Sequence, residues 1–309
     1  MIKVAVLDDW QHVARKLADW SAVDAKASVT VFHDHLSDPD AVVERLKDFD
    51  VVCVMRERTP LPRAILERLP KLKLIASTGR RNASIDAAAA EVQGVTIAAT
   101  GYSSRPTIEL TWALILGVVR HIAAESAQVR AGHWQHTIGT ELGGKTLGLL
   151  GLGNIGSEVA RIGKAFGMEI VAWSQNLTAE RAAEHGATLV TKEDLFRQAD
   201  VLSVHLILSG RSRGLVGTTE LGLMKPTAYL VNTSRGPIVD EAALVAALEK
   251  RLLAGAAVDV YDTEPLPEAH PFRTLPNVLA TPHIGYVSEE LYRTFLGDTV
   301  KNVLQFLDG

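Results

Sequence analysis

The chain has 309 residues, more than a single hydrophobic core usually organises, so two domains are expected. The net charge of −4 shows none of the basic excess of a protein that binds nucleic-acid phosphates. A single cysteine, Cys53, excludes an intramolecular disulfide and a cysteine-clustered metal site, and its apolar neighbours predict a buried core thiol.

The N-terminal segment passes directly into a strand pattern with acidic residues. It has neither the apolar stretch nor the small-residue cleavage site of a signal peptide. No uninterrupted apolar run reaches the length that spans a membrane. We therefore expect a cytoplasmic protein with no bound metal and with neither a membrane nor a nucleic acid as partner.

Short apolar runs rich in Val, Ile, Leu and Thr recur near the N-terminus, separated by helical stretches that include 40–47 and 85–92. Such runs are continuous rather than alternating because helices cover both faces of a parallel sheet. The pattern predicts one α/β domain over residues 1–100. Its strands are expected at 3–9, 29–34, 50–57, 72–78 and 94–100.

One long helix is expected from about 106 to 130, where Pro106 suits the first turn and few helix breakers follow. This helix would connect the first domain to a second α/β series. The strands of that series are expected at 146–151, 169–174, 201–206, 228–233, 254–260 and 278–282.

The final helix starts at Ser288, which can cap its first turn, and Glu289 and Glu290 lie near the positive helix end. An apolar stripe then runs along the helix, and we expect this helix to return to the first domain. The residues of the stripe are Leu291, Phe295, Val303 and Leu307.

The segment from Gly151 to Gly156 reads GLGNIG and matches the pattern G-x-G-x-x-G. Its glycines allow a tight turn, close approach of the backbone to a pyrophosphate, and close packing of helix on strand. The pattern alone is weak, but here it follows a strand and opens a helical stretch at 155–166. Free N–H groups and the positive helix end would face bound phosphates. We therefore predict a dinucleotide-binding domain.

The acid that holds the adenosine ribose of NAD is expected about 20 residues after the glycines, and it is absent. Ser174 and Gln175 stand at the end of the second strand instead. These side chains neither repel a 2′-phosphate nor supply a strong cation, so NAD and NADP both stay open as cofactors. Arg181 could reach a 2′-phosphate, but a solvated position on the helix that Thr178 caps is the simpler interpretation.

Polar residues follow three strands of the second series. Arg235 follows the fourth strand, Asp259 and Glu264 lie at and beyond the end of the fifth, and His283 follows the sixth. Each alone has a plain explanation as a solvated turn residue, a loop residue or a structural histidine. Ligands of a doubly wound sheet lie outside the carboxyl ends of its strands. Together, and beside the glycine-rich turn, these residues therefore predict an active site.

The three types of side chain fit hydride transfer at a 2-hydroxy acid. The hydroxyl proton must leave as hydride leaves the same carbon, and His283 titrates in the useful range. The carboxylate of Glu264 would orient the ring and raise its pKa, which favours the proton-donating form. Arg235 would bind the substrate carboxylate and polarise the 2-oxo group with fixed, charged donors.

Four segments resemble the signature blocks of the D-isomer-specific 2-hydroxyacid dehydrogenases: GLGNIG, NTSRGPIVDEAAL, AVDVYDTEP and TPHIGY. The similarity spans nearly the whole chain. It implies that Arg235 binds the substrate, that Glu264 partners the histidine, and that His283 is the acid/base.

The resemblance implies an α/β fold of two Rossmann-like domains with parallel sheets. In this fold a cofactor domain at 101–286 is inserted into a flavodoxin-like substrate domain formed by 1–100 and 287–309. Members of the family are commonly homodimers joined through the cofactor domain, so a homodimer is expected here.

The resemblance also implies contacts with the cofactor. Asp259 would lie near the nicotinamide carboxamide, and His205 would lie beside the cofactor, although a structural role is an acceptable alternative for this histidine. The residues expected to bind NAD or NADP are Gly151, Gly153, Asn154, Ile155, Gly156, Ser174, His205, Thr233, Ser234, Asp259 and Gly285.

One loop departs from the family. Where the family commonly has a Gly-rich substrate-binding turn, this chain reads STGRRNASID. Gly79 is kept, but Arg80 and Arg81 add charge and bulk where backbone amides would meet a substrate carboxylate. These arginines either face solvent or recognise a second anionic group of the substrate. The residues expected to bind substrate are Arg56, Thr78, Gly79, Arg80 and Arg81.

Three other functions fit parts of the pattern. The C-terminal-binding-protein corepressors carry a similar triad, but this chain ends directly after its last helix, without a tail for partner recruitment. Formate dehydrogenases typically carry Gln at the position of Glu264. A 3-phosphoglycerate dehydrogenase is compatible, although an additional regulatory domain is lacking.

The function that we expect is therefore transfer of a hydride between NAD(P) and a small D-2-hydroxy or 2-oxo acid, as in glyoxylate and hydroxypyruvate reductases. A dinucleotide-sensing interaction protein of the corepressor type is the alternative from another class. The residues do not identify the substrate.

Overall fold

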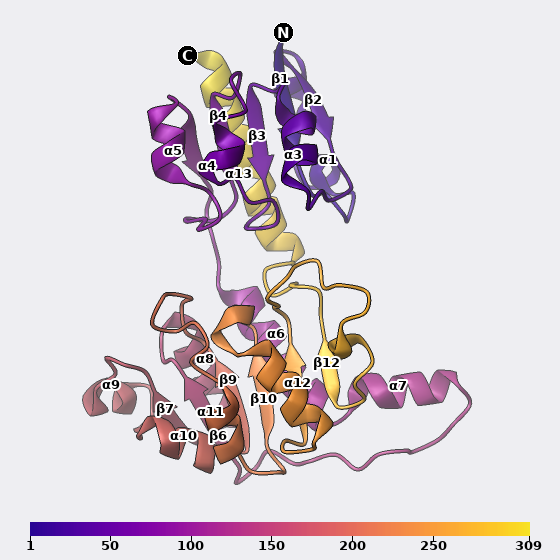
Figure 1. Cartoon of the computed structure of the whole chain (residues 1–309), viewed down its shortest axis with the longest axis vertical. Helices are drawn as coiled ribbons and strands as arrows, with labels where there is room; N and C mark the ends of the chain where they lie inside the picture. The colour runs from indigo at the N-terminus through magenta and orange to yellow at the C-terminus, as the bar shows by residue number, and fades with distance from the viewer. The chain divides into compact units, whose positions relative to one another are not determined.

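The computed structural model describes residues 1–309 and divides them into two compact units. Unit 1 comprises Met1–Ser103 and Val287–Gly309, and unit 2 comprises Ser104–Tyr286. The chain leaves unit 1 once and returns to it, so both ends of the chain, indigo and yellow in Figure 1, belong to the same unit.

Unit 1 is built on a sheet of five parallel strands in the order β2-β1-β3-β4-β5. This is the flavodoxin-like order, which confirms the fold expected for the first part of the chain. The strands are β1 (Ile2–Val6), β2 (Ala27–Val31), β3 (Val51–Val54), β4 (Leu74–Ser77) and β5 (Thr96–Ala99). The helices are α1 (Ala14–Leu17), α2 (Ser21–Asp24), α3 (Pro39–Leu46), α4 (Arg63–Leu66), α5 (Ala87–Val92) and α13 (Glu289–Asp308).

The last helix, α13, packs against β4 and β5 of unit 1, as Figure 1 shows. Ser288 caps it by accepting a hydrogen bond from the Leu291 N–H, as the sequence predicts. Leu291, Phe295 and Val303 are buried, whereas Leu307 near the end is only partly buried. Burial of this apolar stripe is what fixes the C-terminal segment to the sheet that the N-terminal segment builds.

Unit 2 is built on a sheet of seven parallel strands in the order β12-β11-β10-β9-β6-β7-β8. Its strands are β6 (Thr146–Leu150), β7 (Glu169–Trp173), β8 (Thr188–Leu189), β9 (Val201–Val204), β10 (Tyr229–Asn232), β11 (Gly255–Val258) and β12 (Val278–Ala280). Its helices are α6 (Arg105–Val119), α7 (Ile122–Arg130), α8 (Asn154–Ala165), α9 (Ala179–Glu184), α10 (Lys192–Gln198), α11 (Thr218–Leu223), α12 (Glu241–Glu249) and the 3₁₀ turns η1 (Gly236–Ile238) and η2 (Pro271–Arg273).

The strand order of unit 2 is that of a Rossmann fold with β12 added beyond β11. The direction of winding reverses between β6 and β9, which are neighbours in the sheet. In open α/β sheets a ligand binds at such a switch point, outside the carboxyl ends of the strands. The turns that follow β6, β9, β10, β11 and β12 therefore define where a site can form.

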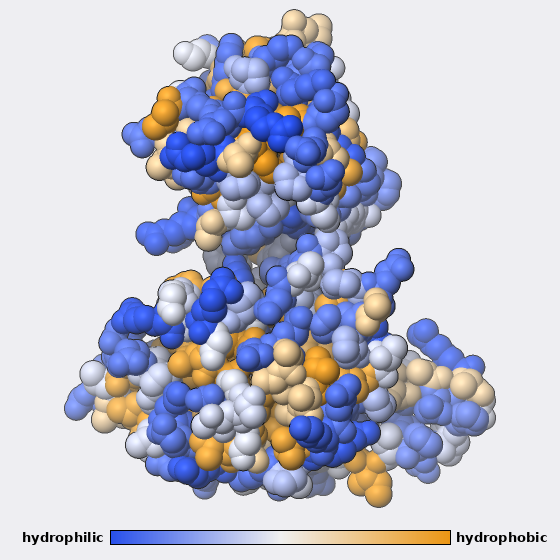
Figure 2. Space-filling view, in the orientation of Figure 1, coloured by the Kyte–Doolittle hydropathy of each residue, from blue (hydrophilic) through white to orange (hydrophobic).

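Two hydrophobic cores lie on the two faces of this sheet. Leu149 and Val231 point into one core, and their neighbours Leu150 and Leu230 point into the other. Both faces are thus covered, which explains why the strands read as continuous apolar runs. On the face that Figure 2 shows, the hydrophobic side chains of each unit lie among hydrophilic ones.

The prediction of a single long helix at 106–130 is wrong. α6 and α7 are separate helices that are bent by 63°. The break lies at His121, whose φ of 51° is in the left-handed region that a helix interior does not adopt. α6 packs on β10 and β11, whereas α7 buries none of its residues. The apolar pattern predicted helix correctly but carries no signal for the break.

No single helix combines the length and apolarity of a membrane span, and α6 and α7 meet those criteria only when the bent pair is counted together. In unit 1, Cys53 lies on β3 and is buried, as the sequence predicts. Burial raises the pKa of its thiol to about 12.

Candidate active site in unit 2

The glycine-rich turn connects β6 to α8. Gly151 has a φ of 105°, and a Cβ added to it would lie 2.8 Å from the carbonyl oxygen of His205. A Cβ on Gly156 would lie 2.3 Å from the carbonyl oxygen of Gly151, so both positions require glycine. A Cβ on Gly153 would meet nothing within 4 Å, which leaves open surface at the N-terminus of α8. This geometry fits the phosphates of a dinucleotide.

His205 follows β9 on the other side of the switch point. Its Nε2 lies 2.9 Å from the hydroxyl of Ser203. Burial lowers the pKa of His205 to about 4, so the ring is neutral near pH 7. This histidine adds no positive charge beside the glycine-rich turn, and its backbone carbonyl packs on Gly151.

The end of β7 carries no acid. Ser174 is partly buried there, and its carbonyl oxygen accepts a hydrogen bond from the Leu177 N–H. Gln175 is exposed, and so is Arg181 in the first turn of α9, the helix that Thr178 caps as predicted. The local structure therefore offers a ribose neither a carboxylate nor a fixed cation.

Arg235 lies in the turn after β10. The buried side chain of Asn232 holds this turn, because its Oδ1 accepts from the Ser234 N–H and its Nδ2 donates to the Arg235 carbonyl oxygen, both at 3.0 Å. The guanidinium of Arg235 donates from Nη1 to the carbonyl oxygen of Ser234 at 2.7 Å. The hydroxyl of Ser234 donates to the Leu206 carbonyl oxygen, which ties the turn after β10 to the segment after β9.

Two threonines of α6 also support the site, and sequence reasoning missed them. Thr107 donates from its hydroxyl to the carbonyl oxygen of Gly285 at 2.9 Å. Thr111 donates to the Thr107 carbonyl oxygen at 2.7 Å, so the Thr233 hydroxyl, 2.8 Å away, is the donor to Thr111 Oγ1. The only signal in the sequence is a pair of threonines four residues apart, on one side of an otherwise apolar helix.

Glu264 and His283 come together although they are 19 residues apart. The Glu264 Oε2 lies 2.5 Å from His283 Nδ1, and its Oε1 accepts a hydrogen bond from the Tyr261 N–H at 3.0 Å. Since Nδ1 donates to the carboxylate, the second ring nitrogen of His283, Nε2, has no protein partner. The imidazole is thus oriented and has one nitrogen available for proton transfer.

His283 sits on strained backbone, with a φ of 52°. Asp259, which has no exposed surface, holds the turn around it. Its carboxylate accepts from the hydroxyl of Thr281 (2.6 Å) and from the N–H groups of Ile284 (2.9 Å) and Gly285 (2.8 Å). Burial raises the pKa of Asp259, and these hydrogen bonds oppose that effect. The contact of Asp259 with nicotinamide stays a prediction, and the bonds seen here assign it a structural task.

The predicted substrate residues lie in unit 1, around the loop after β4. The Arg56 N–H donates to Thr78 Oγ1 at 2.8 Å, and its Nη1 donates to the Thr78 carbonyl oxygen at 3.1 Å. The Gly79 N–H donates to the Thr100 hydroxyl at 2.7 Å. Thr78 and Gly79 are therefore engaged within unit 1, whereas the side chains of Arg80 and Arg81 are exposed.

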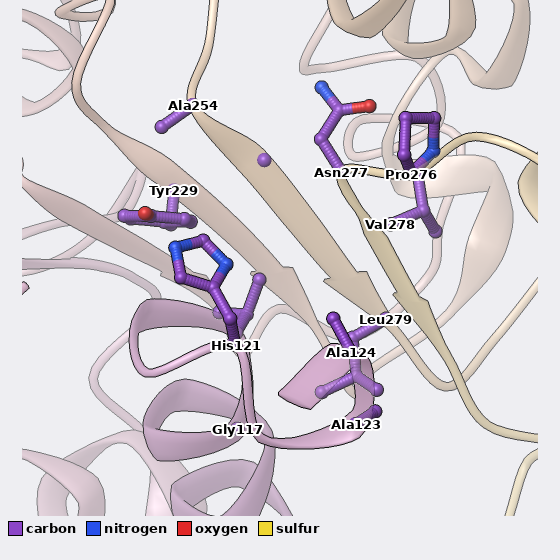
Figure 3. Close-up of a pocket in the computed structure, with 12 residues that line it drawn as sticks. Gly117, His121, Ala123, Ala124, Tyr229, Ala254, Pro276, Asn277, Val278 and Leu279 are labelled. Atoms are coloured by element: carbon purple, nitrogen blue, oxygen red, sulfur yellow. The ribbon is translucent and has the colours of Figure 1, made fainter. Parts of the chain in front are cut away.

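A pocket at the opposite edge of the unit 2 sheet is shown in Figure 3. His121 at the end of α6 points toward Tyr229, and Asn277 lies on the other side. Tyr229, Gly255 and Val278 are the first residues of β10, β11 and β12, so this pocket is at the amino edge. It is separate from the residues described above, which follow the carboxyl ends of the strands.

Comparison with protein families gives a match over residues 112–285 to the model described as D-isomer specific 2-hydroxyacid dehydrogenase, NAD binding domain. The matched range contains every residue of the glycine-rich turn and of the Arg235, Glu264 and His283 cluster.

Among curated proteins, a glyoxylate reductase from Aeropyrum pernix is 41% identical over 255 residues, which cover 79% of this chain and 76% of that protein. A D-3-phosphoglycerate dehydrogenase from Methanocaldococcus jannaschii is 35% identical over 313 residues, which cover 99% of this chain but only 58% of that longer protein. Among solved structures, a phosphoglycerate oxidoreductase from Vibrio cholerae has a TM-score of 0.93 and 41% identity, with 99% of both chains covered.

The geometry of the glycine-rich turn predicts different effects for two similar substitutions. Gly156→Ala should lower the free energy of unfolding by about 1–3 kcal/mol, because its Cβ would overlap the Gly151 carbonyl oxygen. Gly153→Ala should leave stability within about 0.5 kcal/mol but weaken NAD(P)H binding by about tenfold or more, since its methyl group would lie in the open space at the start of α8. Denaturant unfolding and fluorescence titration measure the two effects. Unchanged NAD(P)H binding by Gly153→Ala would contradict the assignment of the phosphate site.

Proposed function

The chain belongs to the D-isomer-specific 2-hydroxyacid dehydrogenase family, and we propose that Arg235, Glu264 and His283 are its catalytic residues. The family membership confirms the resemblance of the four sequence segments and makes the chain an oxidoreductase that transfers a hydride between NAD(P) and a 2-hydroxy or 2-oxo acid. The observation that carries the proposal is the 2.5 Å contact of Glu264 with His283, which leaves Nε2 of the ring without a protein partner.

In the direction of reduction, Arg235 binds the substrate carboxylate and polarises the 2-oxo group. His283 donates the proton on Nε2 to the carbonyl oxygen as the carbon is reduced. Glu264 stabilises the imidazolium before this transfer and keeps the ring from turning. The glycine-rich turn and α8 would hold the dinucleotide phosphates, and the nicotinamide, when bound, supplies the hydride. In the direction of oxidation the same nitrogen accepts the hydroxyl proton.

His283→Ala should lower kcat by about 10²- to 10⁴-fold, because the acid/base group is removed. NAD(P)H binding should be retained, since the glycine-rich turn is untouched. His185→Ala, a change at the end of α9 in the same unit, is the matched control and should retain the activity. Steady-state kinetics with a panel of 2-oxo acids measures both variants, and a His283→Ala enzyme with the kcat of the wild type would refute the proposed role.

NAD and NADP are both proposed as cofactors. The support is the end of β7, where Ser174 and the exposed Gln175 replace the acid that would repel a 2′-phosphate. Arg181 is exposed on α9, and no hydrogen bond from its guanidinium holds it in place. We therefore infer tolerance of NADP rather than selection for it.

Beside glyoxylate, we propose a second substrate class, 2-oxo acids that carry a further anionic group. Arg80 and Arg81 are exposed, neither forms an ion pair, and both directly follow Gly79 in the loop after β4. Asn82 fixes this loop, since its Nδ2 donates to the Arg56 carbonyl oxygen at 2.7 Å and its Oδ1 accepts from the Ser84 N–H at 3.0 Å. A fixed loop that carries two unpaired cations favours an anionic ligand. A phosphorylated hydroxy acid, as in a 3-phosphoglycerate dehydrogenase, is therefore the second candidate beside glyoxylate.

Arg81→Gln should lower kcat/KM for phosphorylated or dicarboxylic 2-oxo acids by about tenfold, the effect of one lost charge-assisted contact of about 1.4 kcal/mol. The value for glyoxylate, which has no second anionic group, should change by less than about twofold. The panel is assayed with NADH and with NADPH. Arg68→Gln on the surface of unit 1 is the control, because Arg68 already pairs with Asp40. Equal losses for glyoxylate and for the dianionic acids would count against this specificity role.

We also propose a homodimer joined through unit 2. The segment 131–143 after α7, called the arm here, exposes large apolar side chains: Trp134 is 77% exposed and Ile138 is 94% exposed. The arm is nevertheless held in place, because the carboxylate of Glu125 on α7 accepts hydrogen bonds from the N–H groups of His136 and Thr137. An ordered segment that presents apolar side chains to water favours a protein partner, and a second copy is the partner expected for this family.

The variant with Trp134→Asp and Ile138→Asp should be a monomer under conditions in which the wild type is a dimer, because two charges would have to be buried in the interface. Light scattering coupled to size-exclusion chromatography gives the mass of each species. Val92→Asp in unit 1, where the valine is 80% exposed, is the control and should leave the dimer intact. A wild-type protein with the mass of one chain, or a dimeric arm variant, would rule out this interface.

A further inference from the structure

A partly buried pair of ionisable side chains, Glu241 and His270, lies beside the candidate active site without being part of it. Glu241 is the first residue of α12, and His270 precedes η2. The Nε2 of His270 lies 3.0 Å from Glu241 Oε1, and the two side chains are only 14% and 17% exposed. The Nδ1 of the ring accepts a hydrogen bond from the Phe272 N–H at 3.2 Å, so the proton of the neutral ring is on Nε2 and points to Glu241.

The second carboxylate oxygen of Glu241 holds the loop that carries Glu264. Its Oε2 accepts a hydrogen bond from the Asp262 N–H at 3.2 Å. Asp262 directly follows Tyr261, whose N–H donates to Glu264 Oε1 at 3.0 Å. A continuous set of contacts thus leads from His270 through Glu241 to the backbone that fixes the catalytic carboxylate.

The turn of Arg235 packs on the same stretch of backbone. A Cβ added to Gly236 would lie 2.1 Å from the carbonyl carbon of Tyr261 and 2.7 Å from the Asp262 nitrogen. No other residue fits there without displacing one of the two backbones. The position of the Tyr261–Asp262 peptide therefore affects both the arginine turn and the glutamate.

The N–H of Asp262 donates to the Glu241 carboxylate although the side-chain carboxylates of the two residues interact unfavourably. Burial and, after it, the negative charge of Glu241 raise the pKa of the Asp262 carboxyl. Two carboxylates close together repel each other, and the N–H of His270 is the donor that offsets this on the other oxygen of Glu241. Without that donor, the Glu241 carboxylate would gain by turning away from Asp262.

Other hydrogen bonds hold the loop that carries Glu264 at positions away from Asp262. Arg273 in η2 donates to the carbonyl oxygens of Leu266 and Pro267. The hydroxyl of Tyr261 donates to the Thr281 carbonyl oxygen at 2.8 Å. The Glu241–His270 pair is thus the contact that holds the loop on the Asp262 side.

We propose that Glu241 and His270 are positioning residues for the hydride-transfer reaction. By fixing the Asp262 backbone, this pair determines the position of the Glu264 carboxylate relative to the His283 ring. The inference rests on the catalytic roles proposed above for Glu264 and His283. Two carboxylates interact with the His283 ring: Glu264 by direct contact and Asp259 through its charge. Only Glu264 lies in the loop that the Glu241–His270 pair holds.

The test compares His270→Phe, which keeps a ring against Phe272 but has no donor, with His270→Gln, whose amide nitrogen can still donate to Glu241. His270→Phe should lower kcat for 2-oxo acid reduction by about tenfold, because Glu264 no longer holds the His283 ring in position for proton transfer. KM should change by less than about twofold, since Arg235 is retained. His270→Gln should behave as the wild type.

A second variant keeps the test decisive if His270→Phe folds poorly. Glu241→Ala should lower kcat with KM nearly unchanged, and the double variant with His270→Phe should be no worse than the more impaired single variant, because both act through one contact. Thermal unfolding monitors the fold of each protein. A wild-type kcat of folded His270→Phe or Glu241→Ala, or an equal loss in His270→Gln, would overturn the proposal.

Glu264→Gln separates this inference from the proposed function. If Glu264→Gln has the kcat of the wild type, the catalytic role of Glu264 is wrong. If Glu264→Gln is impaired while folded His270→Phe is not, only the positioning role fails.

Discussion

The buried carboxylate of Asp259 is the interaction on which the arrangement of unit 2 depends. It lies at the end of β11 and accepts hydrogen bonds from three groups of the turn after β12. A buried carboxylate is unfavourable unless such donors surround it, and here the donors belong to the turn that places His283 in the left-handed region. The free energy of one desolvated charge is thereby linked to the backbone conformation of His283, the residue proposed to transfer the proton.

The other turns of this edge are fixed in a similar way, by hydrogen bonds within unit 2. Asn232 holds the turn of Arg235, Tyr261 offers its N–H to Glu264, and Thr107 binds the carbonyl oxygen of Gly285. Three different strand ends are therefore rigid before any ligand binds. Preorganisation of this kind lowers the reorganisation needed at the moment of reaction.

The fold of unit 2 could be predicted from the sequence because its physical causes are local. Both faces of the sheet are buried, so strands such as β6 are apolar throughout, and Gly156 is required by its local contact with the Gly151 carbonyl oxygen. The contact of Glu264 with His283, and the packing of Gly236 on the Tyr261–Asp262 peptide, agree with one rule, that the carboxyl ends of parallel strands share an edge.

What could not be predicted depends on contacts between distant segments. The break at His121 leaves no trace in the apolar pattern, since the residues on both sides favour a helix. The hydroxyl of Thr78 accepts a hydrogen bond from the Arg56 N–H, 22 residues earlier, and the sequence carries no signal for this contact. The tasks of Thr111 and His270 likewise depend on partners that only the folded chain brings near.

The single cysteine of the chain has a practical consequence. Cys53 is buried on β3, and burial keeps its thiol protonated at neutral pH, so it reacts slowly with alkylating reagents. A cysteine introduced at an exposed position of each unit would then be the preferred site for a maleimide dye. The native sequence thus permits fluorescence measurements of the distance between the two units without first removing a competing thiol.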